Sequence, residues 1–351
     1  ATVSLDVIYS EPSLYGVGDD RALAEAGRGN RRLLLSFVLG RETGNRTNWP
    51  AAFPDFSPVA QVDWRVSPEA VPTLPRASFP TPEVNAGAAA IGMVNQNPDP
   101  DGMFRAIRPL VFFDGRPAPA LSLAAYLLAT PGTVVSSEPG GLLLSPPGKP
   151  LITIPLDAEH RATLNFRGKA GTHSSYSAAA IIQSELRLRE GERPVVAPES
   201  LRGKHVLLGF TAPALLDLRP APPGGVFTGV ELHATALDNL LADDFFRPVP
   251  LPLTLLAAGV LCLAASAFAL RVVTLRQLAL ACCFFLALPV LLFWGAYRAT
   301  YQLPLLLLLV ATFLSLAFSV AVAYATEGRQ RRFLKNAFSQ YLSPDVINEI
   351  I

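Results

Sequence analysis

Cysteine is missing from the first 248 residues of this chain, and the three cysteines that it does contain lie between residues 262 and 283. The first 248 residues therefore use neither disulfides nor a thiolate metal site. Strong charge of either sign is missing too, because the formal net charge of the 351 residues is +1. This balance offers no basic surface for nucleic acid and no acidic surface for cationic partners. A large cysteine-free region is compatible with an oxidising bacterial periplasm.

Acidic residues are absent between residues 249 and 325, where three long apolar runs follow one another. The runs cover residues 249–270, 277–297 and 303–325, and the arginines of this stretch lie at their edges. Each run holds roughly 20 residues, enough to cross a hydrocarbon core of about 30 Å as a helix. We therefore predict a multi-pass protein in contact with membrane lipid. Spans without an intramembrane acid leave little chemistry for transport.

Positive charge in the loops predicts an orientation. Arg271 and Arg276 follow the first run and Arg298 alone follows the second, whereas four basic residues follow the third at 329, 331, 332 and 335. The positive-inside rule then places the C-terminal tail in the cytoplasm and residues 1–248 outside, as expected in a bacterial inner membrane. An exported domain needs a signal peptide or anchor, so we expect an N-terminal membrane segment to precede these residues.

Residues 1–248 alternate apolar runs and amphipathic stretches. Strands are predicted at 3–8, 33–39, 88–94, 109–113, 151–155, 162–166 and 206–210, the last strongly buried, and helices at 21–26, 121–129, 176–188 and 229–241. Asp19 and Asp20 should cap the first helix and Gly27 should end it, while residues 43–86 should be irregular. The pattern predicts an α/β extracytoplasmic domain with a mainly parallel sheet over 1–248. An all-α three-helix transmembrane segment over 249–325 and a cytoplasmic linker over 326–351 follow it.

An acidic loop at residues 97–102 places oxygen ligands at alternate positions before a glycine, which is the spacing of calcium loops. An EF-hand loop needs a bidentate acid at its twelfth position, and here that position is Arg108. We therefore favour a turn in which Asp99 and Asp101 pair with Arg105 and Arg108, with calcium binding as the weaker alternative.

Three further polar positions invite a functional interpretation. Arg167 follows a predicted strand, where an arginine binds an anionic ligand or, as we favour, pairs with a nearby carboxylate. His173 precedes two serines, but the sequence lacks the nucleophile elbow of a hydrolase. His233 lies two residues after Glu231, which is not a zinc-peptidase spacing, so a helix-packing histidine is expected. We assign no metal ligand and no catalytic residue.

Several runs, in order, resemble the second type of CHASE domain, an extracellular sensor domain associated with cyclases and histidine kinases. The run GKHVLLGFTA at 203–212 is similar to a GKxVLIGxTA stretch of that family. LD at 216–217, GVELHA at 229–234 and LDNLL at 237–241 are similar to its PGVEIHANALxNLL signature. DPDGMFRAIRPL at 99–110 and NFRG at 165–168 complete the pattern. The resemblance covers nearly all of residues 1–325, and the chain departs from the family at its start and at Phe210 and Pro213.

This resemblance implies a sensor for a periplasmic ligand or partner, whose identity the sequence does not reveal. It also implies that the matching runs hold the ligand-sensing residues. The candidates are Asp99, Asp101, Arg105, Arg108, Asn165, Arg167, Asp217 and His233.

The tail at residues 331–347 resembles the F-x-x-Y-[VL]-S-P-x-V-[VI] linker that precedes class III nucleotide cyclase domains. A basic helix would leave the membrane here, and Pro344 would break it and start a new helix. The candidate signal-coupling residues are Phe338, Tyr341, Ser343 and Pro344. The resemblance implies a receptor-type adenylate cyclase, a lyase that converts ATP to cyclic AMP and pyrophosphate. Its catalytic residues and its Mg²⁺ or Mn²⁺ would belong to a domain after residue 351.

Class III catalysis resembles a two-metal phosphoryl transfer in which two chains complete each active site, so a homodimer is expected. Two alternatives stay open. The same sensor could be coupled to a histidine or Ser/Thr kinase, or the chain could be a non-enzymatic membrane binding module. The preference for ATP over GTP and the sign of the response are also open.

Overall fold

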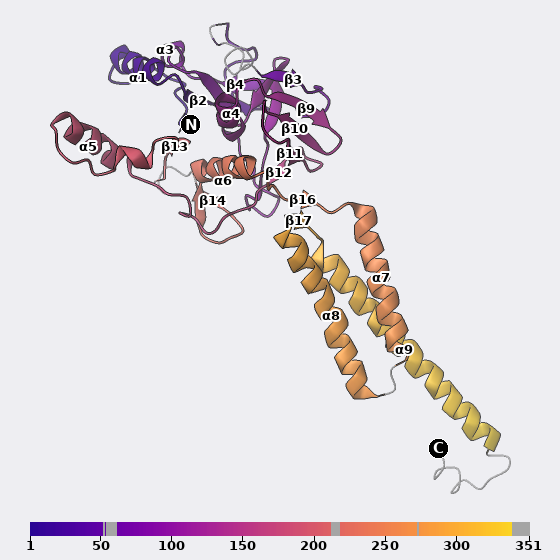
Figure 1. Ribbon diagram of the computed structural model, residues 1–351. Helices are drawn as coiled ribbons and strands as arrows, with labels where there is room; N and C mark the ends of the chain where they lie inside the picture. Colours follow the sequence, from indigo (N-terminus) through magenta and orange to yellow (C-terminus); the bar gives the residue numbers. More distant parts are fainter. Residues whose placement is uncertain (52, 54–61, 212–217, 272–273, 339–351) are drawn as a thin grey trace. The chain divides into compact units, whose positions relative to one another are not determined.

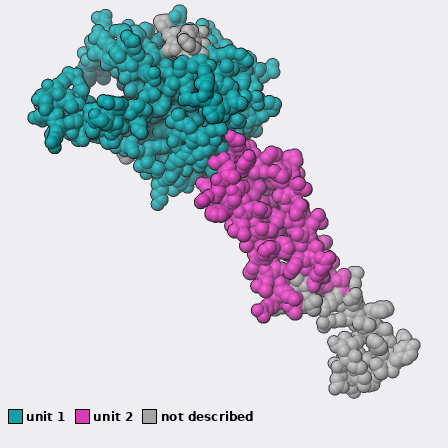
Figure 2. All heavy atoms as spheres, in the orientation of Figure 1, with its two compact units in different colours: residues 1–246 teal, residues 247–351 magenta. Residues whose placement is uncertain are grey.

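The computed structural model describes residues 1–51, 53, 62–211, 218–271 and 274–338 (Figure 1). The chain divides into two compact units, residues 1–246 and residues 247–351 (Figure 2). The first unit mixes strands and helices, and the second consists mainly of three long apolar helices. The predicted fold class is therefore confirmed.

A mainly parallel sheet organises the first unit. Its parallel strands, in spatial order, are β13 (Val206–Gly209), β1 (Val3–Asp6), β2 (Leu33–Gly40) and β5 (Ala90–Met93). A further strand, β4 (Arg76–Ser78), pairs antiparallel with the end of β2. The continuous apolar run of β2 suits this central place, because both faces of the strand are covered and Leu34 and Leu35 are fully buried.

Strand β13 is an edge strand, and the prediction of a strongly buried strand here was wrong. Among the described residues it pairs with β1 alone. Leu208 is 40% exposed, and Phe210, directly after the strand, is 52% exposed. The other face is covered, because Gly209 lies directly against Val230 of helix α6 (Gly229–Ala242).

The first helix, α1 (Val17–Asn30), continues through Gly27, where it was expected to end. A Cβ atom at Gly27 would lie 2.5 Å from the carbonyl oxygen of Gly87. The glycine therefore allows the helix to pack closely against another segment instead of ending it. Asp19 and Asp20 lie in the first turn, where carboxylates favour the helix dipole, and not at the N-cap position.

The stretch 43–86, predicted to be irregular, contains short elements and contributes to a second sheet. The short elements are β3 (Asp63–Arg65), β4 and α3 (Pro82–Asn85). The second sheet has the order β11-β10-β9-β3. It is built on an antiparallel meander of β9 (Val134–Glu138), β10 (Gly141–Ser145) and β11 (Ile152–Pro155). The sequence predicted β11 but missed β9 and β10.

In the described part of the first unit, three short ladders lie outside the two sheets. They pair β6 (Ala106–Ile107) with β12 (Ala162–Thr163), β7 (Leu110–Phe113) with β8 (Arg116–Pro119), and β14 (Leu218–Pro220) with β15 (Val226–Thr228). A short 3₁₀ helix covers Pro198–Ser200. The β6–β12 ladder matters most for function, because it brings two separate polar runs together.

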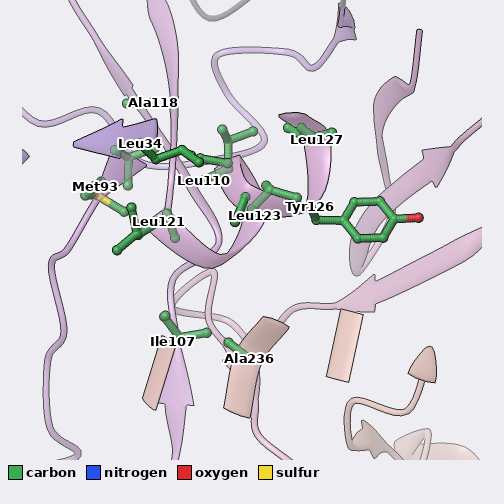
Figure 3. Close-up of a cluster of buried hydrophobic side chains, with 14 of the residues drawn as sticks. Leu34, Met93, Ile107, Leu110, Ala118, Leu121, Leu123, Tyr126, Leu127 and Ala236 are labelled. Atoms are coloured by element: carbon green, nitrogen blue, oxygen red, sulfur yellow. The ribbon is translucent and has the colours of Figure 1, made fainter. Parts of the chain in front are cut away.

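The core of the first unit surrounds helix α4 (Leu121–Ala129), which is almost entirely Leu and Ala. Such a helix is apolar all round and suits a buried position. Figure 3 shows Leu121 and Leu123 of α4 among side chains from the parallel strands and from α6, including Leu34, Met93 and Ala236. Gly92 allows α4 to approach β5 closely, because a Cβ atom there would lie 2.6 Å from the Cα of Leu121.

Helix α5 (Ala178–Arg189) was predicted, but its apolar face is not covered within the described residues. Ile182 is 62% exposed and Leu186 is 55% exposed, and in Figure 1 the helix stands clear of the sheet. Its buried residue is Ser184, whose hydroxyl donates to the Ala180 carbonyl and accepts from the Val196 amide.

The second unit contains α7 (Leu251–Ala269), α8 (Leu275–Arg298) and α9 (Leu305–Phe338). All three are long and apolar enough to cross a membrane, and they coincide within a few residues with the predicted spans. Helices α7 and α9 meet at Ser266 and Ser315, whose hydroxyl oxygens lie 2.7 Å apart. The Ser315 hydroxyl also donates to the carbonyl of Cys262, at 3.0 Å. Two short strands, β16 (Arg247–Pro248) and β17 (Tyr301–Gln302), pair in parallel before α7 and α9.

Candidate functional site

The β6–β12 ladder places the acidic loop beside the segment that leads to Asn165 and Arg167. Ala106 pairs with Thr163 and Ile107 with Ala162, and the Leu164 amide donates to the carbonyl of Arg105 at 2.9 Å. Two motifs about 60 residues apart in the sequence thus become neighbours.

The loop at 97–102 forms the expected turn. Gly102 has a left-handed φ of 82°, and the Asp99 amide donates to the carbonyl of Met103 at 2.8 Å. Arg105 Nη1 donates to Asp99 at 2.7 Å, and the Arg105 fork binds both carboxylate oxygens of Asp101 at 2.9 and 2.7 Å. The hydrogen bond from Arg105 lowers the pKa of Asp101 to about 2. The predicted pairing of both acids with Arg105 is confirmed.

Arg161 completes this first cluster, and the sequence did not single it out. Its Nη1 donates to Asp99 at 2.7 Å and its Nε donates to Asp157 at 3.0 Å. Its Nη2 lies 3.5 Å from the Glu159 carboxylate. Asp99 therefore bridges Arg105 and Arg161, and the side chains of Asp99 and Arg161 are only 16% and 18% exposed.

Arg108 does not pair with the loop carboxylates, so that part of the prediction was wrong. Its Nη2 donates to the backbone carbonyl of Glu159 at 3.2 Å. Among the described residues the guanidinium has no ion pair, and its buried Nε has no hydrogen-bond partner. Burial lowers the pKa of Arg108, and the charge of Arg161 lowers it further. The acids that Arg108 was expected to bind are paired with Arg105 and Arg161 instead.

A second cluster surrounds Arg167, as the favoured carboxylate pairing predicted. Arg167 Nε donates to Asp238, and its Nη1 and Nη2 donate to the two oxygens of Asp244 at 2.5 and 2.9 Å. These hydrogen bonds raise the pKa of Arg167. Asp238 lies on α6 and Asp244 just beyond its end, so one guanidinium holds the helix and the segment after it.

Asn165 strengthens this second cluster through reciprocal bonds with Asn239. The Asn165 amide donates to Asn239 Oδ1 at 2.8 Å, and Asn239 Nδ2 donates to the Asn165 carbonyl at 2.9 Å. Asn165 Nδ2 also donates to Asp244 at 3.1 Å. Asn239 is fully buried. The second cluster therefore fastens the end of α6, a few residues before the chain enters α7.

His233 is fully buried on α6, and neither ring nitrogen has a hydrogen-bond partner among the described residues. Burial lowers its pKa to about 4, against a smaller opposing effect of the nearby Val94 backbone. This environment matches the expected packing histidine. His173, by contrast, lies with Nε2 3.1 Å from the Thr235 hydroxyl.

The remaining candidates cannot be placed in a site. Asp217, Tyr341, Ser343 and Pro344 lie outside the described residues. Phe338 is the last residue of α9. The candidates of the first unit thus separate into the Arg105–Arg161 cluster, the Arg167 cluster, the singly bonded Arg108 and the buried His233.

A family model described as the CHASE2 domain matches residues 1–269. This chain belongs to the CHASE2 domain family. The match includes both arginine clusters and α7, the first apolar helix. Comparison with curated proteins gave no match, and comparison with solved structures gave none either. A CHASE2 sensor domain joined to three helices able to cross a membrane identifies a membrane protein with the organisation of a signalling receptor.

Within the CHASE2 domain, sequence reasoning missed Arg161, Asp157, Asp238, Asn239 and Asp244 as members of the clusters. Two signals could have found some of them. Asp157 and Arg161 have the spacing of a local ion pair, and Asp238 and Asn239 lie inside the family signature. Asp244 carries no comparable signal.

Proposed function

We propose that this chain is the sensor and membrane part of a bacterial receptor-type adenylate cyclase. A periplasmic ligand or partner would act on the CHASE2 domain of a homodimer. The signal would pass through the membrane helices to a cytoplasmic catalytic domain after residue 351. That domain would convert ATP to cyclic AMP and pyrophosphate with Mg²⁺ or Mn²⁺.

The observation that carries this proposal is the continuity of α9. The helix runs without interruption for 34 residues, through the third span and into the basic run that resembles a cyclase linker. At a rise of 1.5 Å per residue it is about 51 Å long. A continuous helix of this length is well suited to transmit a displacement from one side of a membrane to the other.

The Arg167 cluster supplies the corresponding connection on the sensor side. It joins the 165–167 segment to Asp238 and Asp244, and only a few residues then separate Asp244 from α7. A change at the β6–β12 ladder, which Asn165 follows by two residues, would therefore act directly on the segment leading into the membrane. We propose that this clamp couples the CHASE2 domain to the first span.

The orientation belongs to the proposal and rests on the loop charges. It can be measured with Leu14→Cys, since Leu14 is 99% exposed, in a chain whose three native cysteines are replaced by alanine. A membrane-impermeant maleimide should label this residue in intact spheroplasts. A matched Ser339→Cys variant should be labelled only after permeabilisation, and the reverse pattern would contradict the orientation.

The output is tested with the full-length receptor in membranes of a cyclase-deficient host. Cyclic AMP should form from ATP in the presence of Mg²⁺ or Mn²⁺, and a parallel reaction with GTP measures nucleotide preference. Pro344→Ala should change basal activity or its response to stimulus. Transfer of labelled phosphate to protein without cyclisation would favour a kinase output instead, and neither activity would favour a binding module.

A further inference from the structure

Arg108 is unusual among the arginines of the polar clusters because its charge is not matched by a carboxylate. It is partly buried, and its one hydrogen bond within the described part of the chain goes to a neutral carbonyl, that of Glu159. Its Nε–H is buried without an acceptor. A buried polar group without a partner is rare in folded proteins and calls for an explanation.

The acids close to Arg108 are already engaged by other arginines. The acids whose charges act on Arg108 are Asp157 and Glu159; Asp157 binds Arg161 at 3.0 Å, and the Glu159 carboxylate lies 3.5 Å from the same guanidinium. Recruiting Asp157 or Glu159 to Arg108 would draw it away from Arg161, which it contacts at 3.0 or 3.5 Å. A rearrangement that gave Arg108 a carboxylate partner from this cluster would therefore cost another ion pair.

Other cations add to the positive charge at this position. The β6–β12 register, continued by one residue, places Arg108 opposite Arg161, and like charges at opposite positions are destabilising. The charge of Arg41 also lowers the pKa of Arg108, whereas the carboxylates of Asp157 and Glu159 oppose this, and the net direction is a lowered pKa. Arg41 is exposed and has no hydrogen bond or ion pair within the described residues.

The position of Arg41 in the fold is also that of a ligand-binding residue. It directly follows β2, at the carboxyl end of a central strand of the parallel sheet. Open α/β sheets bind their ligands outside the carboxyl ends of the strands. Arg108 lies near the same edge, because the Ala120 amide donates to the carbonyl of Pro109, and Ala120 forms a bridge with Met93 at the end of β5, the neighbour of β2.

We propose that Arg108 and Arg41 form a binding site for a small anion that carries a carboxylate or phosphate group. The planar guanidinium fork suits both groups, which accept two hydrogen bonds from one arginine. The bound anion would supply the missing acceptor and screen Arg108 from Arg41 and Arg161. This inference rests on the proposed sensor role and names the chemical class of the ligand.

The test uses residues 1–351 in phosphatidylcholine nanodiscs, whose headgroups carry no net charge. Thermal unfolding is followed by tryptophan fluorescence while phosphate or succinate replaces chloride at constant ionic strength. Saturable binding should raise Tm by about 3–6 °C at ten times the apparent Kd. Arg108→Gln should abolish the rise, Arg41→Gln should weaken it, and Arg108→Lys should retain only part of it. Arg189→Gln, on exposed helix α5, is the matched control and should retain all of it.

An equal rise in Tm in wild type and Arg108→Gln would overturn the proposal. A wild-type Tm in phosphate or succinate that is no higher than in chloride would overturn it too. A rise that depends on Arg108 but occurs only in phosphatidylglycerol nanodiscs would assign the site to lipid headgroups and overturn the small-anion assignment. If Arg108→Gln does not fold, Arg108→Lys and Arg41→Gln decide the matter. The measurement needs no cyclase activity, so its failure is distinguishable from failure of the proposed output.

Discussion

Replacing His233 by leucine tests how the core of the CHASE2 domain tolerates a buried imidazole. The side chain is fully buried, and in the part of the chain that the structure describes neither ring nitrogen has a hydrogen-bond partner. Leucine has a similar volume and no polar atom, so it should pack at this position with little rearrangement. Removing a polar group that has no partner should leave stability at pH 7 unchanged or slightly higher.

The effect should grow as the solution is acidified. Burial lowers the pKa of His233 from 6.5 to about 4, so the unfolded state binds more protons than the folded state between these values. Stability therefore falls as the pH falls through this window and is constant above pH 6.5. Each pKa unit corresponds to about 1.4 kcal/mol, so the loss at pH 4 is about 3 kcal/mol.

The measurement is urea unfolding of wild type and His233→Leu in nanodiscs between pH 4 and pH 7, followed by tryptophan fluorescence. The difference in unfolding free energy should increase by about 3 kcal/mol as the pH is lowered across this range. Other acidic groups titrate in both proteins and cancel in the difference. His160→Asn is the matched control, because it removes a partly exposed imidazole from a left-handed position that asparagine accepts.

A difference between wild type and His233→Leu that stays constant from pH 4 to pH 7 would refute this reasoning. It would mean that the imidazole finds a proton acceptor or a water molecule in the folded state. A pH-dependent difference of the same size for His160→Asn would also refute it, because burial would then not be its cause.

Three other substitutions test particular contacts. Arg167→Gln should lower the unfolding free energy by about 1–2 kcal/mol, because two partly exposed carboxylates lose their ion pair with the arginine; urea unfolding measures this, and no loss would show that the clamp is not stabilising. Gly92→Ala should cost about 1–3 kcal/mol, because its Cβ would lie 2.6 Å from the Leu121 Cα; an unchanged Tm would contradict that approach. Ser315→Ala should weaken the contact between α7 and α9 by about 0.6 kcal/mol; unfolding of the membrane unit in SDS should show it, with exposed Leu314→Ala as the control.

The membrane helices and the parallel sheet could be predicted because single strong patterns specify them. A run of about 20 apolar residues has few alternatives to a span. The same patterns do not distinguish the centre of a sheet from its edge. The apolar residues 206–210 predicted a buried strand, yet among the described strands β13 pairs with β1 alone. The prediction that Gly27 ends the first helix was wrong for a similar reason, because a glycine that permits close packing looks the same in sequence as one that ends a helix.

The polar clusters were predictable only as far as their members are local. The pairing of Arg105 with Asp99 and Asp101 spans a few residues, and turn chemistry was sufficient to anticipate it. The bond between Arg161 and Asp99 depends on the β6–β12 ladder, which two short strands form over a long sequence separation. Without that ladder, the expectation that Arg108 pairs with the same acids was reasonable and wrong.

Because α9 is one unbroken helix, it fixes the rotation about the helix axis of the residues that follow the third span, as well as their distance from that span. The 12 residues from 327 to 338 continue the helix past the end of the third span at Thr326. One inserted residue would rotate everything beyond it by about 100° and advance it by about 1.5 Å, whereas seven would restore the facing to within about 20°. A series of such insertions would show whether signalling depends on the rotation of the residues beyond the insertion or on their distance from the span.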